Sequence, residues 1–173
     1  DVTITGETTG DSFGASFVTG DFNADGRTGL AVGANGYSTS SGRAYIFHND
    51  GSIPTTAATA DVIITGEASS QFGHGSLVVG DLNADGKADL VVGARSYSTS
   101  TGRAYIFYND GSIPTTAATA DVIMTGETTS NYYGESLASA DFNNDGRADL
   151  AVGATGYSSS KGRVYMYTFN DGV

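Results

Sequence analysis

The sequence predicts an all-β fold of β-propeller-type blades, each made of four antiparallel strands, and three observations lead to this prediction. The 173 residues repeat at a fixed spacing, because the same acidic pattern starts at Asp21, Asp81 and Asp141, a period of 60 residues. Each period contains short β-like runs separated by turns rich in Gly, Asn and Asp. No long segment has the apolar spacing of a helix. Three 60-residue units, each too small to bury its own sheet faces, are typical of stacked propeller blades.

Four β-like runs, here named a to d, recur along the chain. Run a covers residues 16–20, 76–80 and 136–140, and run b covers 30–34, 90–94 and 150–154. Both are short and apolar, which is typical of strands covered on both faces. Run c covers 43–47, 103–107 and 163–167, and run d covers 61–65 and 121–125. Polar loops such as 36–42 connect b to c, and tight turns follow c at 49–51, 109–111 and 170–172.

The order of the runs predicts one repeat array over residues 1–173 with one blade split between its termini. Residues 1–5 match run d, so we expect an orphan outer strand at 1–8, which lacks its own a, b and c. The expected blades are then 9–68, 69–128 and 129–173, and the last of these lacks a fourth strand. Three blades are fewer than the roughly four to eight of closed propellers, so the two ends of one chain are not expected to meet.

This arrangement of ends predicts association between copies of the chain. We expect residues 1–7 of one molecule to add to the open edge at 163–169 of another, as an extra strand. Such a contact is heterologous, and it either closes into a ring or continues as a filament. Two copies would give a six-blade ring. A chain of further identical units, of which this is a piece, is the remaining alternative.

Each period carries an acidic loop between runs a and b. Oxygen-bearing side chains stand at loop positions 1, 3, 5 and 9 around a glycine at position 6, which suits a hard cation such as calcium. In an EF-hand, position 12 would be a Glu that binds with both oxygens, but here it is Val32, Val92 or Val152, and a strand follows instead of a helix. An EF-hand is therefore excluded.

The repeat resembles the FG-GAP repeat, the blade unit of integrin α-chain propellers and of many secreted microbial proteins. The resemblance rests on Phe13-Gly14, Phe72-Gly73 and Tyr133-Gly134 upstream of the acidic loops, and on Gly33-Ala34, Gly93-Ala94 and Gly153-Ala154 downstream. In that family the loop binds calcium, which implies about three sites. The implied side-chain ligands are Asp21, Asn23, Asp25, Asp81, Asn83, Asp85, Asp89, Asp141, Asn143, Asp145 and Asp149, and the implied backbone ligands belong to Arg27, Lys87 and Arg147.

Three positions depart from the family pattern. Gly29 replaces the last carboxylate of the first loop, so we expect that site to bind calcium more weakly. Phe72 lies one residue earlier than the period predicts, which indicates a local bulge before run a. Tyr133 replaces Phe in the third copy, where its ring can still pack with the hydroxyl at the rim.

Composition and charge narrow the possible partners. The formal net charge is −11, and eight of the 19 acidic residues lie in the three loops, where bound cations would neutralise them. Only eight Lys and Arg residues oppose this charge, so neither nucleic acid nor an anionic membrane is an expected partner. There is no Cys and no apolar run long enough to cross a bilayer. Because weak calcium loops fill where calcium is millimolar, we expect an extracellular or cell-surface setting.

The sequence gives little support for catalysis. Ser16, Ser76 and Ser136 recur, but the flanking pattern is not a nucleophile elbow, and neither His48 nor His74 repeats with them. We therefore expect a non-enzymatic calcium-binding scaffold or adhesion module whose partners are other copies of itself, and also a glycan or an extracellular protein. A lectin-like propeller is the alternative, with Tyr37, Tyr97 and Tyr157 as sugar-stacking candidates, although packing at the blade edge is the preferred role for these rings. A domain of a secreted enzyme ranks third.

Overall fold

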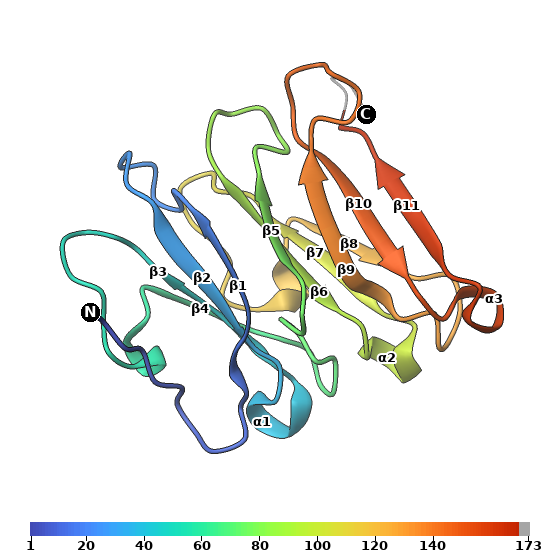
Figure 1. Ribbon diagram of the computed structural model, residues 1–173, viewed down its shortest axis with the longest axis horizontal. Helices are drawn as coiled ribbons and strands as arrows, with labels where there is room; N and C mark the ends of the chain where they lie inside the picture. The colour runs from blue at the N-terminus through green and yellow to red at the C-terminus, as the bar shows by residue number, and fades with distance from the viewer. Residues whose placement is uncertain (170–173) are drawn as a thin grey trace.

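The computed structural model describes residues 1–169 and contains three antiparallel β-sheets, which follow one another in chain order along the long axis (Figure 1). The first sheet has the order β1-β2-β3-β4, with β1 Phe13–Gly20, β2 Gly29–Ala34, β3 Arg43–Phe47 and β4 Val62–Thr65. The second has the order β5-β6-β7-β8, with β5 Leu77–Gly80, β6 Asp89–Ala94, β7 Arg103–Phe107 and β8 Val122–Thr125. The third has the order β11-β10-β9, with β9 Tyr133–Ala140, β10 Asp149–Ala154 and β11 Arg163–Tyr167. The predicted all-β fold of propeller-type blades is confirmed, and within residues 1–169 the third sheet has three strands.

The short connections between strands b and c are tight helical turns: α1 Tyr37–Ser40, α2 Tyr97–Ser100 and α3 Tyr157–Ser160. Each turn contains left-handed residues, for example Ser38 at φ 46° and Thr39 at φ 53°. Two single 3₁₀ turns, Ala57–Thr59 and Ala117–Thr119, lie between strands c and d. Among the described residues, no helix is long and apolar enough to cross a membrane.

Sheet faces become buried where one sheet packs on the next. One core lies between the first and second sheets and includes Ala31, Ile46, Leu90 and Phe107. A second core, between the second and third sheets, includes Val91, Ile106, Leu150 and Val152. The side chain at position 2 of the acidic loop takes part in each core, as Phe22 in the first and Leu82 in the second. The first and second acidic loops are therefore fixed to the junctions between sheets.

The predicted irregularity at Phe72 takes a specific form. In the first and third sheets the pairing of the inner strand shifts register, in the first between Phe13 and Ser16. The second sheet has one more residue at this point, and its inner strand β5 begins only at Leu77. Phe72 is nevertheless buried, with its ring edge-on to Tyr105 at 5.5 Å, as Phe13 is to Tyr45 at 5.5 Å. The extra residue shortens the strand and leaves the aromatic anchor in place.

Tyr133 fills the aromatic position of the third repeat. It is buried and meets Tyr165 edge-on with ring centroids 5.3 Å apart. Its hydroxyl donates to the hydroxyl of Tyr167 at 2.8 Å, so the additional oxygen has a partner inside the same blade.

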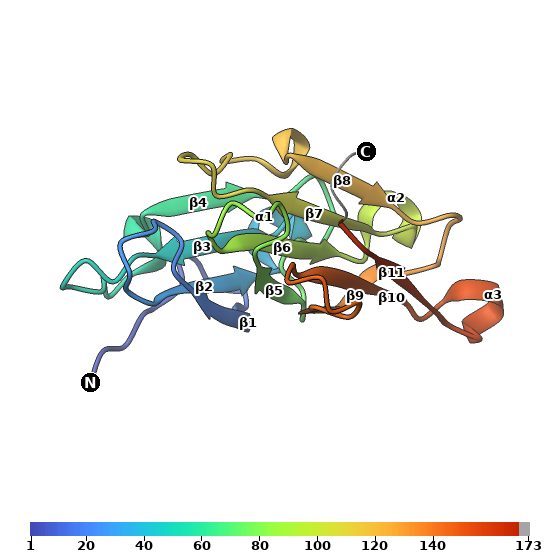
Figure 2. The same ribbon diagram turned by 90° about the horizontal axis from the view of Figure 1, so that it is seen from above.

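The two ends of the array are open. Residues 1–4 pair with no strand, but Thr5 forms a parallel bridge with Thr56, as Thr65 does with Thr116. The N-terminal segment thus lies against the first sheet as a fourth strand of a preceding blade would. This segment and α3 are at opposite ends of the molecule (Figures 1 and 2). The turn expected at 170–172 lies outside the described residues.

Candidate metal centres

The three acidic loops are held by their own side chains. In the second loop, the backbone N–H of Asp85 donates to Asp81 Oδ1 and to Asn83 Oδ1, both at 3.0 Å. Gly86 N–H donates to Asp81 Oδ2 at 2.9 Å, and Lys87 N–H donates to Asp85 Oδ1 at 2.9 Å. Because one amide contacts oxygens of both Asp81 and Asn83, these two side chains lie on the same side of the loop. Gly86 has φ 81°, which permits the tight turn.

The first and third loops repeat this geometry. Asp25 N–H reaches Asp21 Oδ1 at 3.2 Å and Asn23 Oδ1 at 3.3 Å. In the third loop the corresponding distances from Asp145 N–H are 3.1 Å to Asp141 and 2.9 Å to Asn143. The predicted ligands at positions 1, 3 and 5 are thus brought together in all three copies.

The carboxylate at position 9 lies apart from the exposed part of the loop. Asp89 is fully buried, and its oxygens accept N–H bonds from Leu82 and Asn109, both at 2.9 Å. Burial raises the pKa of Asp89, while those two backbone N–H groups act in the opposite direction. In this arrangement Asp89 links the start of the loop to the end of strand c.

Asp149 occupies the same place in the third loop but is less completely bonded. Its Oδ2 accepts from Phe142 N–H at 2.9 Å and Asn143 N–H at 3.2 Å. Its Oδ1 is buried and has no hydrogen-bond partner within residues 1–169. A buried carboxylate oxygen without a partner is costly, and a bound cation is one way to satisfy it.

Gly29 leaves the first loop without a carboxylate at position 9, and the backbone explains part of the difference. A β-carbon at Gly29 would lie 2.6 Å from the carbonyl oxygen of Phe47. The start of β2 therefore has no room for a side chain unless the end of β3 moves.

The donor set of each loop has the chemistry of a hard-cation site. Positions 1, 3 and 5 supply only oxygen ligands, two carboxylates and one amide, and the backbone carbonyl at position 7 is close by in sequence. The N–H of Arg27, the amide of Asn23 and the nearby Arg27 and His48 charges lower the pKa of Asp25, which keeps this exposed carboxyl ionised as a ligand must be. Over residues 1–169 no three Asp, Glu, His or Cys side chains are gathered around one point, because the third converging side chain is Asn. The loops fit calcium by donor type and by fold.

A second repeated cluster links neighbouring blades. Glu67 follows strand d of the first blade, and its Oε2 accepts bonds from Arg103 at 2.7 Å and from the hydroxyl of Tyr105 at 2.6 Å. Burial and Glu67 both raise the pKa of Tyr105 well above its ordinary value. The other two copies are Arg43 with Glu7 at 2.9 Å and Arg163 with Glu127 at 2.7 Å. Each of these arginines thus pairs with a carboxylate that follows the d-type segment preceding its own blade.

The same arginines stack on the tyrosines of the b–c turns. The guanidinium carbon of Arg103 lies 3.6 Å from the ring centre of Tyr97, and that of Arg43 lies 3.7 Å from the ring of Tyr37. Arg163 covers Tyr157 at 3.6 Å. One face of each ring is therefore occupied, which supports a role for these rings in packing at the blade edge.

Replacing Glu67 tests whether the cluster holds the blades together. Glu67→Gln is expected to lower the free energy of unfolding by about 1–3 kcal/mol, because Arg103 and the buried Tyr105 lose a charged partner. Glu127→Gln is the matched control, with side-chain exposures in its ion pair of 39% for Arg163 and 48% for Glu127, and it should cost less than about 1 kcal/mol. Urea unfolding measures both, and equal losses would contradict a special role for Glu67.

Neither histidine forms part of a repeated site, and one serine has a clear structural role. The hydroxyl of Ser16 donates to the carbonyl of Gly73 in the next blade at 2.7 Å. Burial and the charge of Arg95 lower the pKa of His74.

Sequence reasoning missed Arg95, whose side chain bonds Glu135 at 2.6 Å and Gln71 at 3.1 Å. Its signal was a single charged residue where the other repeats have Asn35 and Thr155.

Comparison with known proteins gives a consistent result. The FG-GAP repeat model matches residues 13–47, 75–107 and 133–167. Human phosphatidylinositol-glycan-specific phospholipase D is 44% identical over 100 residues, which cover 50% of this chain and 12% of that protein. Mouse integrin alpha-M is 33% identical over 166 residues, 89% of this chain and 14% of the integrin. Mouse integrin alpha-IIb is 34% identical over 173 residues, 92% of this chain and 16% of the integrin. The chain thus spans a small part of the length of each relative.

Proposed function

The chain belongs to the FG-GAP repeat family, and on that premise we propose that it is a non-enzymatic, calcium-binding scaffold of the adhesion type that works outside the cell or at its surface. The observation that carries the proposal is the threefold recurrence of one loop geometry, in residues 21–25, 81–85 and 141–145. Integrin alpha chains, which match over most of this chain, contain repeats of the same kind. The match to the phospholipase covers half of this chain and 12% of that protein.

Calcium would be held at positions 1, 3 and 5 of each loop, with Asp81, Asn83 and Asp85 as the second set. Bound calcium supplies positive charge that offsets the repulsion between these carboxylates. Leu82, inside this loop, is buried in the core between the second and third sheets, so ordering the loop also orders that junction. Calcium binding and packing of the blades are therefore coupled.

We also propose that copies of the chain assemble by strand donation, because within residues 1–169 β11 is an edge strand with one unpaired side. In the first sheet Arg43 pairs with Thr65, and Ala44 pairs with Ile64. Residues 1–5, Asp-Val-Thr-Ile-Thr, resemble 61–65, Asp-Val-Ile-Ile-Thr, so the same register would place Thr5 of a second copy beside Arg163. Two copies joined twice give six blades in a ring, and a rotation that does not close gives a filament.

The lectin alternative receives less support than the scaffold. The tyrosines that would stack on a sugar have one ring face covered by an arginine. Binding on a glycan array that is lost in the Tyr97→Ala and Tyr157→Ala variants would reverse this preference.

Calorimetric titration with calcium tests the metal sites directly. Three sites are expected, and the first should be weaker because Gly29 leaves its loop without the carboxylate that, as Asp89 in the second loop, fixes the start of the loop to the end of strand c. Asp85→Asn should remove or weaken one site, since it takes away a charged ligand. Asp110→Asn, in an exposed turn outside the loops, is the control and should leave all three sites intact. No measurable calcium uptake by the unsubstituted protein at millimolar calcium would refute the proposal.

A further inference from the structure

We infer that the exposed face of the third sheet is a docking surface for the first sheet of a second copy of this chain. The inference rests on the proposed function, and it extends assembly from a shared strand edge to a complete blade-to-blade interface. The first sheet of the second copy would pack on this third sheet in the way that the second sheet packs on the first and the third packs on the second.

The exposure of equivalent positions shows which face lacks a cover. Ala44 and Ala104 are fully buried beneath the next sheet, whereas Val164, at the same place in the third sheet, is 66% exposed. Ile46 and Ile106 are likewise fully buried, and Met166 is 60% exposed. The third sheet keeps the apolar side chains of an internal junction without a partner for them.

The acidic loop gives the same contrast. The residue at loop position 2 is Phe22, Leu82 or Phe142, and the exposed fractions of these residues are 3%, 1% and 44%. The first two pack into the core shared with the next sheet. Phe142 has the size and chemistry to do so, but within residues 1–169 no further sheet packs against it.

A groove on this face corresponds to a filled site elsewhere. It has a volume of about 230 Å³ and is lined by Ser136, Leu137, Ala138, Ala151, Gly153 and Val164. At the internal junctions the equivalent glycines, Gly33 and Gly93, lie against the backbone carbonyls of Gly73 and Gly134 in the next blade. The three atoms nearest to a β-carbon at Gly153 belong to Ser136 of the same blade. The groove therefore has the shape of a site for the Phe-Gly segment of a following blade.

The first sheet presents that segment at the other end of the molecule. A β-carbon added at Gly14 would meet no atom within 4 Å, and Phe17 is 71% exposed. Leu77, at the position equivalent to Phe17, is only 7% exposed because it packs into the core between the first two sheets. The segment from Phe13 to Phe17 is thus the chemical counterpart of the groove.

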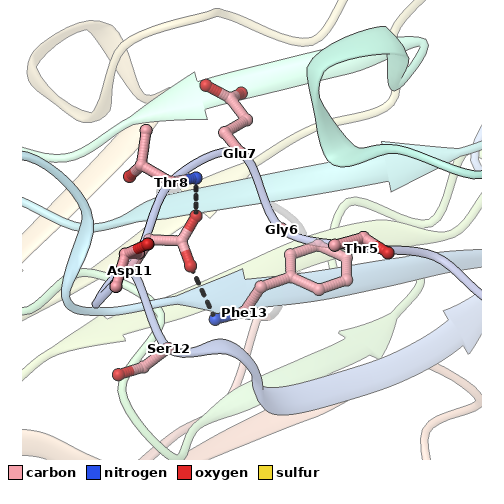
Figure 3. Close-up of a pocket in the computed structure, with 8 residues that line it drawn as sticks. Thr5, Gly6, Glu7, Thr8, Asp11, Ser12 and Phe13 are labelled. Carbon is pink, nitrogen blue, oxygen red and sulfur yellow. Dashed lines mark hydrogen bonds between the residues drawn. The ribbon is translucent and has the colours of Figure 1, made fainter.

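The pocket in Figure 3 supplies a second matching feature. It has a volume of about 440 Å³ and is lined by residues from Thr5 to Phe13. At the internal junctions the equivalent segments cover a b–c turn: Phe72 N–H donates to Ser41 O, and Tyr133 N–H donates to Thr101 O, both at 3.2 Å. In the first sheet the N–H of Phe13 is instead bonded to Asp11 at 3.3 Å (Figure 3).

The turn at 160–162 of a second copy is the segment that would enter this pocket. By the pattern of the internal junctions, the carbonyl of Lys161 would accept the N–H of Phe13. The pocket and this turn belong to opposite ends of one molecule, so the contact joins two molecules head to tail (Figure 2).

Sedimentation velocity over a concentration series in millimolar calcium tests the docking surface. The unsubstituted chain is expected to associate at about 100 μM or below. Val164→Lys, which places a charge in the groove, and Phe17→Lys, on the opposite surface, should each weaken association by tenfold or more. Ile123→Lys is the control, because Ile123 is also exposed, at 38%, but lies on the middle sheet away from both surfaces. Circular dichroism checks that the three variants keep the same β-structure.

Mixing the variants tests the head-to-tail geometry. Val164→Lys keeps an intact first sheet and Phe17→Lys keeps an intact third sheet, so an equimolar mixture should form dimers with one good junction. Neither variant should do so alone. A monomeric unsubstituted chain at about 100 μM, or an equal loss in Ile123→Lys, would overturn the docking surface. Repeating the series with a chelator separates the docking surface from the proposed calcium-binding function. Association that persists without calcium supports the docking surface and argues that assembly does not depend on calcium.

Discussion

Removing calcium with a chelator is expected to lower the midpoint of thermal unfolding by several degrees for each site that is lost. A ligand that binds only the folded state adds about 2.7 kcal/mol at 100 times its dissociation constant. For a chain of this size, about 1 kcal/mol shifts the midpoint by roughly 2–4 °C. On the proposed function, the loops would bind calcium only when strands a and b are paired, and this would supply the linkage. Scanning calorimetry over a calcium series measures the effect.

Variants of the second loop assign the calcium-dependent stability to a site. Asp81→Ala removes a side chain whose two oxygens accept N–H bonds from Asp85 and Gly86. It should reduce the calcium-dependent rise in the midpoint by about one site's share, and it should also lower the midpoint in chelator because these two bonds hold the loop without calcium. Asp50→Ala, in an exposed turn, should leave the calcium-dependent rise unchanged. Identical midpoints of the unsubstituted protein with and without chelator would show that calcium does not stabilise the fold.

The strands could be predicted because their signals are local and repeat. Runs such as 103–107 combine β-forming residues with turns on both sides, and three copies reinforce one another. The b–c turns were harder to predict, since Ser38 and Thr39 adopt left-handed φ values that neither residue type favours. Tyr37 packs against Arg43 at this turn, and local sequence does not predict such a contact.

Among the candidate metal residues, too, the sequence predicts local contacts but not contacts between distant residues. Positions 1, 3 and 5 are brought together by bonds within a few residues, which the spacing alone predicts. Asp89 bonds Asn109, twenty positions away, and only the paired strands place them together. The exposed side chains Val164 and Met166 look like core residues in sequence, because their equivalents are core residues. What distinguishes them is the absence of a following sheet among the described residues, which is a property of the array rather than of the residue.

Substituting the glycine of a central strand should have a large effect where a neighbouring sheet covers it and a small effect where none does. A β-carbon at Gly93 would overlap the backbone carbonyl of Gly134 in the third sheet, and a backbone atom cannot swing away. Gly93→Ala is therefore expected to separate these sheets and to lower the free energy of unfolding by about 3 kcal/mol.

The third sheet supplies the matched control at the same place in its own central strand. The three atoms nearest to the β-carbon of Gly153→Ala would all belong to Ser136, and the closest is its exposed hydroxyl, which can rotate away. Unfolding of the monomer should therefore change by less than about 1 kcal/mol. Urea unfolding in dilute solution measures both variants, and equal losses would contradict the account of glycine as the residue that permits close approach of the sheets. At higher concentration, where association is measured, Gly153→Ala should have the larger effect of the two variants. Gly153→Ala places its methyl group where the carbonyl of Gly14 from a second copy would lie, so it should weaken assembly although it hardly affects the single chain.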